Sequence, residues 1–472
     1  MAMDAGDLWL LKQTSFDFDN IVFEGGGAKG IAYMGTLEVL HEVGIYEKLH
    51  RFAGVSMGAV FATLMALGFT PREVKEFSRT LDASAFLDAT CGYLAFLPNL
   101  AWSYGWHPAK KFYNAMSEQI REKHGDSLLT FGKLYHDHGK ELCIVASNMS
   151  TSSVEYFHPK TTPDFPIMEA LAMSISIPVV MKPKYSFVNG RGEYFVDGGV
   201  LNNYPINTFD GWYLSMDPKH SFLHHANIEE EQSSWFDGFS EKTLGAMVFS
   251  TDEREVFKRE FGERMKDYPP DRPNTSLMRK RLPHMTKIDA DNRKQDTVKE
   301  IAHKLMACLR ERNLDQSMHI TKTELTDALK SSNISPEEYK LLFGNTKPDK
   351  VFDEIDRYDD DFVSVHALVS YFAKRGVPIH HGAHSRPSHV IDSLTTYMIA
   401  IIDSITARHK EVVVKRRDLD RSIGIDCDYI TTMDDLEDED IEFLITQGRN
   451  AAIAFLKIYV EQKGKSAKSQ MD

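Results

Sequence analysis

The stretch Gly54-Val55-Ser56-Met57-Gly58 has the spacing of a serine nucleophile on a sharp turn between a strand and a helix. Such a turn lifts one hydroxyl above the end of a sheet, and its crowded backbone leaves room only for glycine on either side. Residues 49–53 predict the end of a buried strand, and residues 59–67 predict a buried helix that ends at Gly68. The first amides of that helix would favour a developing anion. The alternative is a glycine-rich turn with an inert serine at position 56.

A second glycine-rich segment, Gly25-Gly26-Gly27-Ala28-Lys29-Gly30, lies between a strand-like run at 20–23 and a helical pattern at 31–43. Consecutive backbone amides at the start of a helix bind anions. The segment also satisfies G-x-G-x-x-G, but the acidic residue of a dinucleotide site could only be Glu47, which does not stand at a clear strand end. No Lys-Ser or Lys-Thr pair follows, so a phosphate loop of the nucleotide-hydrolase type is excluded. The segment favours an oxyanion hole, where each donor contributes about 3 to 4 kcal/mol.

The third motif is Asp197-Gly198-Gly199, which follows a strand-like run at residues 193–196. A carboxylate at the end of a strand could lie close to the nucleophile and accept its proton. The same three residues also suit a hairpin turn. Taken alone, this motif leaves both interpretations open.

In order and context, the three motifs resemble the patatin-like phospholipase family, whose members use a Ser-Asp dyad. Residues 172–178 and 199–205 are similar to the family's sequence before and after its aspartate. The resemblance implies a serine hydrolase in which Ser56 is the nucleophile and Asp197 the general base. It implies that the oxyanion donors and the basic position of the glycine loop are Gly25, Gly26, Gly27 and Lys29. The lysine could equally have a structural role.

The activity implied by the resemblance is that of a phospholipase A type lipid acyl hydrolase, which cleaves acyl esters through an acyl-enzyme on Ser56. The same intermediate could pass its acyl group to another alcohol, so an acyltransferase is the alternative. A catalytically silent regulatory protein that retains the fold as a scaffold is a third possibility. A Ser-His-Asp triad with one of the histidines after Asp197 is less economical, because a dyad needs no histidine. Those histidines are His220, His224 and His225. No cofactor is required by the dyad.

The expected fold class is α/β, with a three-layer patatin-like hydrolase core and a mainly α-helical inserted domain. The chain of 472 residues exceeds one ordinary domain. Proline-rich breaks near residues 268–273 and 376–387 would interrupt helices and delimit the insertion. The predicted parts are the first part of the core at 17–265, the insertion at 266–386, the second part of the core at 387–462 and a polar tail at 463–472.

Two segments of the insertion resemble EF-hand loops, which surround Ca²⁺ with oxygen ligands on a sharply turned backbone. Ile320 and Val363 would take the apolar position 8 of the two loops. Position 6 should be glycine but is Met318 in one loop and Asp361 in the other, and Ala367 replaces the second loop's glutamate. The weak calcium candidates are Asn313, Asp315, Ser317, Glu324, Asp356 and Asp360. A degenerate EF-hand pair and a generic helical insertion with polar loops therefore both fit.

The formal net charge of −14 argues against general nucleic-acid binding. The expected partners are an acyl lipid, the surface of a membrane and a protein regulator that binds the insertion. Basic runs at 279–281 and 415–417 and an aromatic stretch at 93–106 are candidate lipid contacts, although solvated charges and core packing explain them equally well. The start of the chain lacks a secretory signal pattern, and no run reaches about 18 apolar residues. We therefore expect a protein that is cytoplasmic or peripheral at membranes, and delivery into another cell is compatible with the sequence.

Overall fold

The computed structural model divides the chain into two compact units, one of Met1–Met278 with Ser388–Asp472 and one of Arg279–Pro387. It describes residues 4–80, 105–107, 109–188, 190–225, 234–251, 261–262, 264–312, 319–332, 334–356, 362–374, 397, 400–402, 404–406, 410 and 414–469.

A mixed sheet forms the centre of the first unit, with the described strands in the order β12-β9-β1-β2-β4-β8-β7 and β5 paired to β4. The strands from β12 to β4 run parallel, whereas β5 and β8 are antiparallel to β4, and β7 is antiparallel to β8. Their bounds are β1 (Asn20–Phe23), β2 (Arg51–Val55), β4 (Glu141–Asn148), β5 (Ser153–Phe157), β7 (Lys184–Val188), β8 (Arg191–Asp197), β9 (Thr243–Phe249) and β12 (Ser422–Asp426). The short strands β3 (Gly105–His107) and β6 (Val179–Met181) pair separately.

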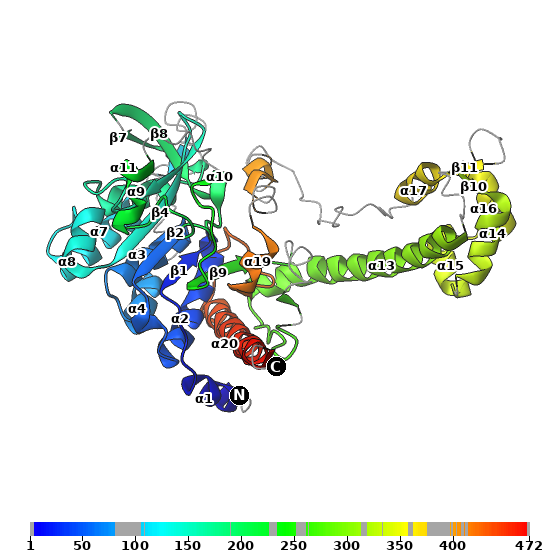
Figure 1. Ribbon diagram of the computed structural model, residues 1–472, viewed down its shortest axis with the longest axis horizontal. Helices are drawn as coiled ribbons and strands as arrows, with labels where there is room; N and C mark the ends of the chain where they lie inside the picture. Colours follow the sequence, from blue (N-terminus) through cyan, green and yellow to red (C-terminus); the bar gives the residue numbers. More distant parts are fainter. Residues whose placement is uncertain are drawn as a thin grey trace. The chain divides into compact units, whose positions relative to one another are not determined.

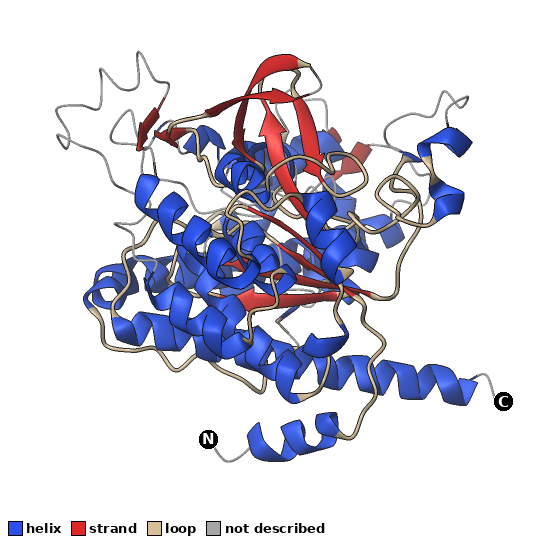
Figure 2. Cartoon of the chain, turned by 90° about the vertical axis from the view of Figure 1, so that its left-hand side faces the viewer, coloured by secondary structure: helices blue, strands red, loops and turns tan. Residues whose placement is uncertain are grey.

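Helices pack around this sheet in the first unit (Figures 1 and 2). The α-helices are α1 (Asp4–Lys12), α2 (Tyr33–Glu42), α3 (Met57–Ala66), α4 (Pro71–Thr80), α7 (Lys110–His124), α8 (Phe131–His138), α9 (Ile167–Ser174), α10 (Gly199–Asn202), α11 (Phe222–His225), α19 (Arg416–Asp420) and α20 (Asp438–Ser469). The 3₁₀ turns are η1 (Gly27–Ala32), η2 (Tyr46–Lys48) and η4 (Pro218–His220).

Both faces of the parallel strands are buried, which makes the core three layers thick. On one face, Phe23 of β1 packs against Tyr33 of α2 and Phe61 of α3. On the other face, the neighbouring Val22 belongs to a buried cluster that includes Tyr204. Because successive side chains of a strand point to opposite faces, these two contacts place covering layers on both sides of β1. The expected α/β core is confirmed.

Helix α20 packs on α2 through glycines that bring the two backbones into contact (Figure 1). A Cβ atom built on Gly448 of α20 would lie 1.8 Å from the carbonyl oxygen of Ala32, and one built on Gly35 of α2 would lie 1.8 Å from that of Ile445. The Thr36 hydroxyl donates a hydrogen bond to the Gly448 carbonyl oxygen at 3.1 Å. The chain therefore needs glycine at both points of this helix pair.

The substitution Gly448→Ala should lower the melting temperature by several degrees, because the added methyl group collides with backbone rather than with a movable side chain. Overpacking of this kind costs about 1–3 kcal/mol. Thermal unfolding followed by circular dichroism measures the change. The control is Gly6→Ala, since no atom lies within 4 Å of the Cβ position there. Equal melting temperatures for the two variants would contradict the close approach of α2 and α20.

The second unit is helical, with one two-stranded ribbon. Strands β10 (His319–Thr321) and β11 (Phe362–Ser364) pair antiparallel, with Ile320 directly opposite Val363. The helices are α13 (Ser276–Arg312), which begins in the first unit, α14 (Lys322–Ser331), α15 (Pro336–Phe343), α16 (Pro348–Ile355) and α17 (Val365–Lys374). The pairing of the two residues assigned to position 8 supports the EF-hand-like interpretation, which stays a prediction.

Candidate active site

Ser56 lies on a sharp turn between β2 and α3 and has an unusual backbone conformation, with φ 53° and ψ −126°. A residue with a side chain seldom adopts such angles, which cost about 1–3 kcal/mol and occur mostly at functional sites. The flanking residues must be glycines, because there is no space for a Cβ atom at either position. A Cβ on Gly54 would lie 2.3 Å from the carbonyl oxygen of Gly58, and one on Gly58 would lie 2.5 Å from that of Glu24. The turn therefore has the geometry that the G-x-S-x-G spacing predicts.

Ser174 at the end of α9 holds this turn against the sheet. The Ser56 amide donates to the Ser174 hydroxyl oxygen at 2.9 Å. The Ser174 hydroxyl in turn donates to the carbonyl oxygen of Val145 in β4 at 2.6 Å. All three residues are buried, so a small side chain links the strained turn to a neighbouring strand. Sequence analysis placed Ser174 before the aspartate but did not give it this function.

Asp197, at the end of β8, lies beside Ser56. The Ser56 side chain is close enough to lower the pKa of the Asp197 carboxyl group, and the Gly199 amide donates to Oδ1 of Asp197 at 2.7 Å. The aspartate backbone is fixed as well, because its amide donates to the Ser176 carbonyl oxygen at 2.8 Å. Burial raises the pKa of Asp197 to about 6, although the Ser56 side chain and the Gly199 amide act in the opposite direction. The carboxyl group therefore titrates close to neutral pH, as suits a general base.

The glycine loop approaches Ser56, but its amides are not equivalent. The Gly25 amide donates to the Asn203 carbonyl oxygen at 3.0 Å, which removes it from the predicted set of oxyanion donors. In the part of the chain that the structure describes, the amides of Gly26, Gly27 and Met57 have no such acceptor. The motif around Ser56 includes Met57, but Met57 was not among the predicted oxyanion donors, although the residue after a nucleophile is a common one.

Gly27 is also constrained by its neighbours. It has φ 52°, and a Cβ atom there would lie 2.2 Å from the Thr432 carbonyl oxygen, so only glycine fits. The adjacent Ala28 amide donates to that same oxygen at 3.0 Å. Lys29 is buried in η1, where its amide donates to the Gly26 carbonyl oxygen at 3.1 Å. It is not among the described residues that line the cavity at Ser56, which favours its structural role.

Residues 21–210 match the family model of the patatin-like phospholipases, and the matched region contains the glycine loop, Ser56 and Asp197. The uncharacterized protein YqhO of Bacillus subtilis (strain 168) is 30% identical over 208 residues, which cover 42% of this chain and 67% of that protein. The chain belongs to the patatin-like phospholipase family.

Two further proteins are similar to this patatin-like chain. The probable lipid hydrolase 463L of Invertebrate iridescent virus 6 is 27% identical over 190 residues, covering 40% of this chain and 62% of that protein. The chain thus spans less than two thirds of that relative's length. The crystal structure of VipD from Legionella pneumophila aligns over 94% of this chain and 67% of that one, with 15% identity and a TM-score of 0.41. Membership of the family is therefore based on the sequence matches.

A buried ion pair lies directly beneath the glycine loop of this patatin-like core. The Lys410 ammonium is 2.6 Å from Oε1 of Glu24, and both side chains are buried. The same Glu24 carboxylate accepts hydrogen bonds from the Asn203 side chain at 3.1 Å and from the Val248 amide at 3.1 Å. Nearby, the Thr406 hydroxyl donates to the Gly199 carbonyl oxygen at 2.9 Å. Sequence analysis missed this pair, because its partners lie 386 positions apart and neither belongs to a motif.

A cavity of about 270 Å³ opens at Ser56, with Gly27 and Met57 in its wall. Its apolar lining comes from Ile31, Met57, Phe61, Ile175, Ile177, Met181, Met433, Leu436 and Ile441. Its polar lining, besides Ser56, comes from Ser78, Arg79, Thr432, Asp434, Asp435 and Asp438. The acidic segment at 432–441 was not assigned to the site by any of the three motifs, because its place beside Ser56 depends on tertiary contacts.

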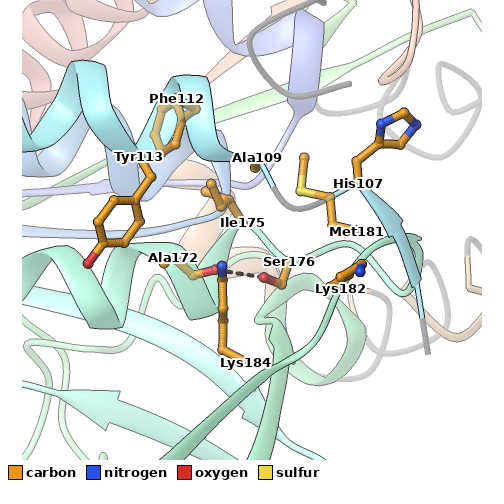
Figure 3. Close-up of a pocket in the computed structure, with 10 residues that line it drawn as sticks. All are labelled: His107, Ala109, Phe112, Tyr113, Ala172, Ile175, Ser176, Met181, Lys182 and Lys184. Atoms are coloured by element: carbon orange, nitrogen blue, oxygen red, sulfur yellow. Dashed lines mark hydrogen bonds between the residues drawn. The ribbon is translucent and has the colours of Figure 1, made fainter. Parts of the chain in front are cut away.

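A second cavity of about 10 Å³ lies beside Ser176 (Figure 3). The Ser176 hydroxyl donates to the Ala172 carbonyl oxygen at 2.7 Å, as the dashed line in Figure 3 shows. A volume of this size holds roughly one water molecule. The cavity at Ser56 is therefore the better candidate for a substrate.

The alternative site residues are not brought to Ser56. His220, His224 and His225 are absent from the described lining of its cavity. Glu324 caps helix α14, because Oε2 accepts hydrogen bonds from the Thr321 amide at 2.7 Å and from its hydroxyl at 2.8 Å. The other described calcium candidate, Asp356, follows α16. The remaining candidates, Asn313, Asp315, Ser317 and Asp360, lie outside the described residues.

The residues that the structure describes contain no group of three or more His, Cys, Asp or Glu side chains arranged to hold a metal ion. Within the same residues, no helix combines the length and the apolar character that crossing a bilayer requires.

The substitution Lys410→Met should destabilise the first unit by about 3 kcal/mol, because it leaves the buried Glu24 carboxylate without its cation. Thermal and denaturant unfolding measure the loss. Adding Glu24→Gln should recover at least half of it, since no uncompensated charge remains. The matched control is Arg72→Met, which breaks an exposed pair with Glu76 and should cost less than about 0.5 kcal/mol. Equal losses for the two Met variants would contradict the buried pair.

Proposed function

We propose that the chain hydrolyses acyl esters of phospholipids or related lipids through an acyl-enzyme on Ser56, with Asp197 as general base. The observation that carries the proposal is the buried Asp197 carboxyl group beside Ser56, whose strained turn places it in the lining of a cavity with a largely apolar wall. Membership of the patatin-like phospholipase family supports the same substrate class.

In the proposed reaction, Oγ of Ser56 attacks the ester carbonyl carbon while Asp197 takes the hydroxyl proton. The negative charge that develops on the carbonyl oxygen is stabilised by amides of Gly27 and Met57, which line the cavity. Asp197 then returns the proton to the leaving alcohol, so the alcohol departs and the acyl group stays on the serine. In the second half of the reaction, Asp197 takes a proton from a water molecule that attacks the acyl carbonyl carbon, and it returns this proton to Oγ of Ser56 as the fatty acid is released.

The cavity favours a fatty acyl chain as the group bound beside Ser56. Its volume of about 270 Å³ is near the lower end of typical ligand sites, which start at roughly 300 Å³. Its apolar wall would bury methylene groups, each worth about 0.8 kcal/mol. The side chains of Asp434, Asp435 and Asp438 also line this cavity. The polar part of a bound substrate would therefore lie near negative charge.

The proposed chemistry needs no metal or other cofactor, because the nucleophile, the base and the oxyanion donors all belong to the chain. We assign the second unit a regulatory role, in which a protein partner or calcium acts on it. Its ordered ribbon between β10 and β11 supplies a folded surface for such binding. The proposed place of action is a membrane surface that the protein meets from the aqueous side.

A fluorophosphonate probe should label the protein covalently at Ser56, and the Ser56→Ala variant should not be labelled. Ser78→Ala is the matched control, because Ser78 is a buried serine in the wall of the same cavity. Labelling is followed by in-gel fluorescence. Equal labelling of the Ser56 and Ser78 variants would exclude Ser56 as the nucleophile.

Asp197→Asn should retain the fold and lower turnover of 4-nitrophenyl butyrate at least about 100-fold, since the amide cannot accept the serine proton.

The pH profile of 4-nitrophenyl butyrate hydrolysis tests the role of Asp197. Only the ionised carboxylate acts as base, so kcat/KM should rise with pH and reach half of its plateau near the Asp197 pKa of about 6. At pH 5 the value should be about tenfold below the plateau. Melting temperatures at each pH establish that the protein stays folded. A midpoint near the ordinary aspartate value of about 4 would contradict the buried base.

A further inference from the structure

The β7–β8 hairpin at the edge of the sheet (Figure 1) exposes aromatic side chains where an antiparallel hairpin ordinarily presents polar ones. Tyr185, Phe187 and Tyr194 are 57%, 71% and 41% exposed. Alternate residues of the same strands face inward, where Val188 and Phe195 are buried. The exposed rings therefore share one face of the hairpin, and we call Tyr185, Phe187 and Tyr194 the aromatic face.

The aromatic face is a single cluster. The ring of Tyr185 lies 4.9 Å from that of Tyr194 and 6.2 Å from that of Phe187, measured between centroids. Gly192, directly opposite Phe187, makes room for this arrangement, since a Cβ atom there would lie 1.9 Å from the Tyr185 hydroxyl oxygen. The half-exposed Met149 adjoins the cluster, because its amide donates to the Tyr194 carbonyl oxygen at 2.9 Å. A contiguous exposed patch of this kind indicates an interaction surface.

The chemistry of the aromatic face favours a lipid surface as its partner. Tyr rings combine an apolar body with a polar hydroxyl, which suits the headgroup level of a bilayer. The exposed Arg191 begins β8 at the end of the hairpin, on the strand face opposite the rings, whereas Lys182 and Lys184 line the small cavity beside Ser176. The acidic Glu193 is buried and accepts a hydrogen bond from the Asn148 side chain at 2.6 Å. The exposed charge of the hairpin is therefore a cation, which can contact headgroup phosphates.

We propose that the aromatic face docks the protein on the surface of a phospholipid bilayer. The proposal rests on the lipid substrate proposed above and identifies the surface through which the enzyme reaches it. Asp197 follows Tyr194 by three residues on β8, which corresponds to about 10 Å along the strand. The cavity-lining residues Ile177 and Met181 lead directly into β7. Docking at the hairpin therefore brings the bilayer close to the cavity at Ser56.

The test is sedimentation with vesicles of phosphatidylcholine and phosphatidylglycerol, using Ser56→Ala protein so that the lipid is not consumed. In this background, the triple variant Tyr185→Ser, Phe187→Ser, Tyr194→Ser should bind vesicles at least about tenfold more weakly, because it loses the apolar area that enters the interface. With Ser56 restored, the triple variant should hydrolyse 4-nitrophenyl butyrate within about twofold of wild type. That soluble ester needs no bilayer. The three positions are exposed, and the melting temperature verifies the fold.

The matched control replaces three exposed apolar residues on other elements by serine: Trp9, Leu128 and Leu223. It should retain vesicle binding. A second variant, Arg191→Gln, should weaken binding to vesicles that contain phosphatidylglycerol about threefold and reduce the effect of salt.

Unchanged vesicle binding by the triple variant would overturn the proposal, and so would an equal loss in the serine control. Light scattering tests a different occupant. A wild-type dimer that becomes monomeric in the triple variant, with vesicle binding unchanged, would make the aromatic face an interface between two copies. Selective loss of vesicle binding in a protein without Ser56-dependent ester hydrolysis would support the docking surface while contradicting the proposed function.

Discussion

The positive φ of Ser56 is the constraint on which the candidate site depends. This backbone conformation is strained, so it persists only where neighbouring contacts over-determine it. Gly54 and Gly58 make the turn sterically possible, and Ser174 ties its amide to β4. The same turn sets the start of α3 and therefore places Met57 in the lining of the cavity. One strained residue thus determines where both the hydroxyl and a proposed oxyanion donor lie.

Burial raises the pKa of Asp197 and so suits it to its proposed role as a base, and the polar contacts around it limit how far the pKa rises. An aspartate in water would be too weak a base at neutral pH, whereas complete loss of polar contacts would keep it protonated. The Gly199 amide and the Ser56 hydroxyl oppose part of the effect of burial, and the pKa is raised only to about 6. The buried Glu24 shows the other solution, since a cation and two hydrogen-bond donors surround it. The two buried carboxylates of the site therefore have different partners, namely a hydroxyl and a backbone amide at Asp197 and an ammonium group at Glu24.

The sequence predicted those parts of the site that obey local steric rules. Gly27, Gly54 and Gly58 have no space for a Cβ atom, so the motif alone revealed them. The α/β core was likewise predicted from local patterns, namely strand-like runs followed by glycine-rich turns and helices. The use of the Gly25 amide could not be predicted, because it depends on Asn203, far along the chain. The acidic cavity wall at 434–438 and the Glu24–Lys410 pair likewise arise from tertiary contacts without a local pattern.

The segment that follows the second unit has a structural role in the site itself. Lys410 reaches the carboxylate beneath the glycine loop, and Thr406 binds the carbonyl oxygen of Gly199, whose amide holds Asp197. Further on, Thr432 fixes the glycine loop through Ala28, and Gly448 locks α20 onto α2. The matched family region at residues 21–210 therefore holds the proposed nucleophile and base, but the residues after the second unit complete their surroundings.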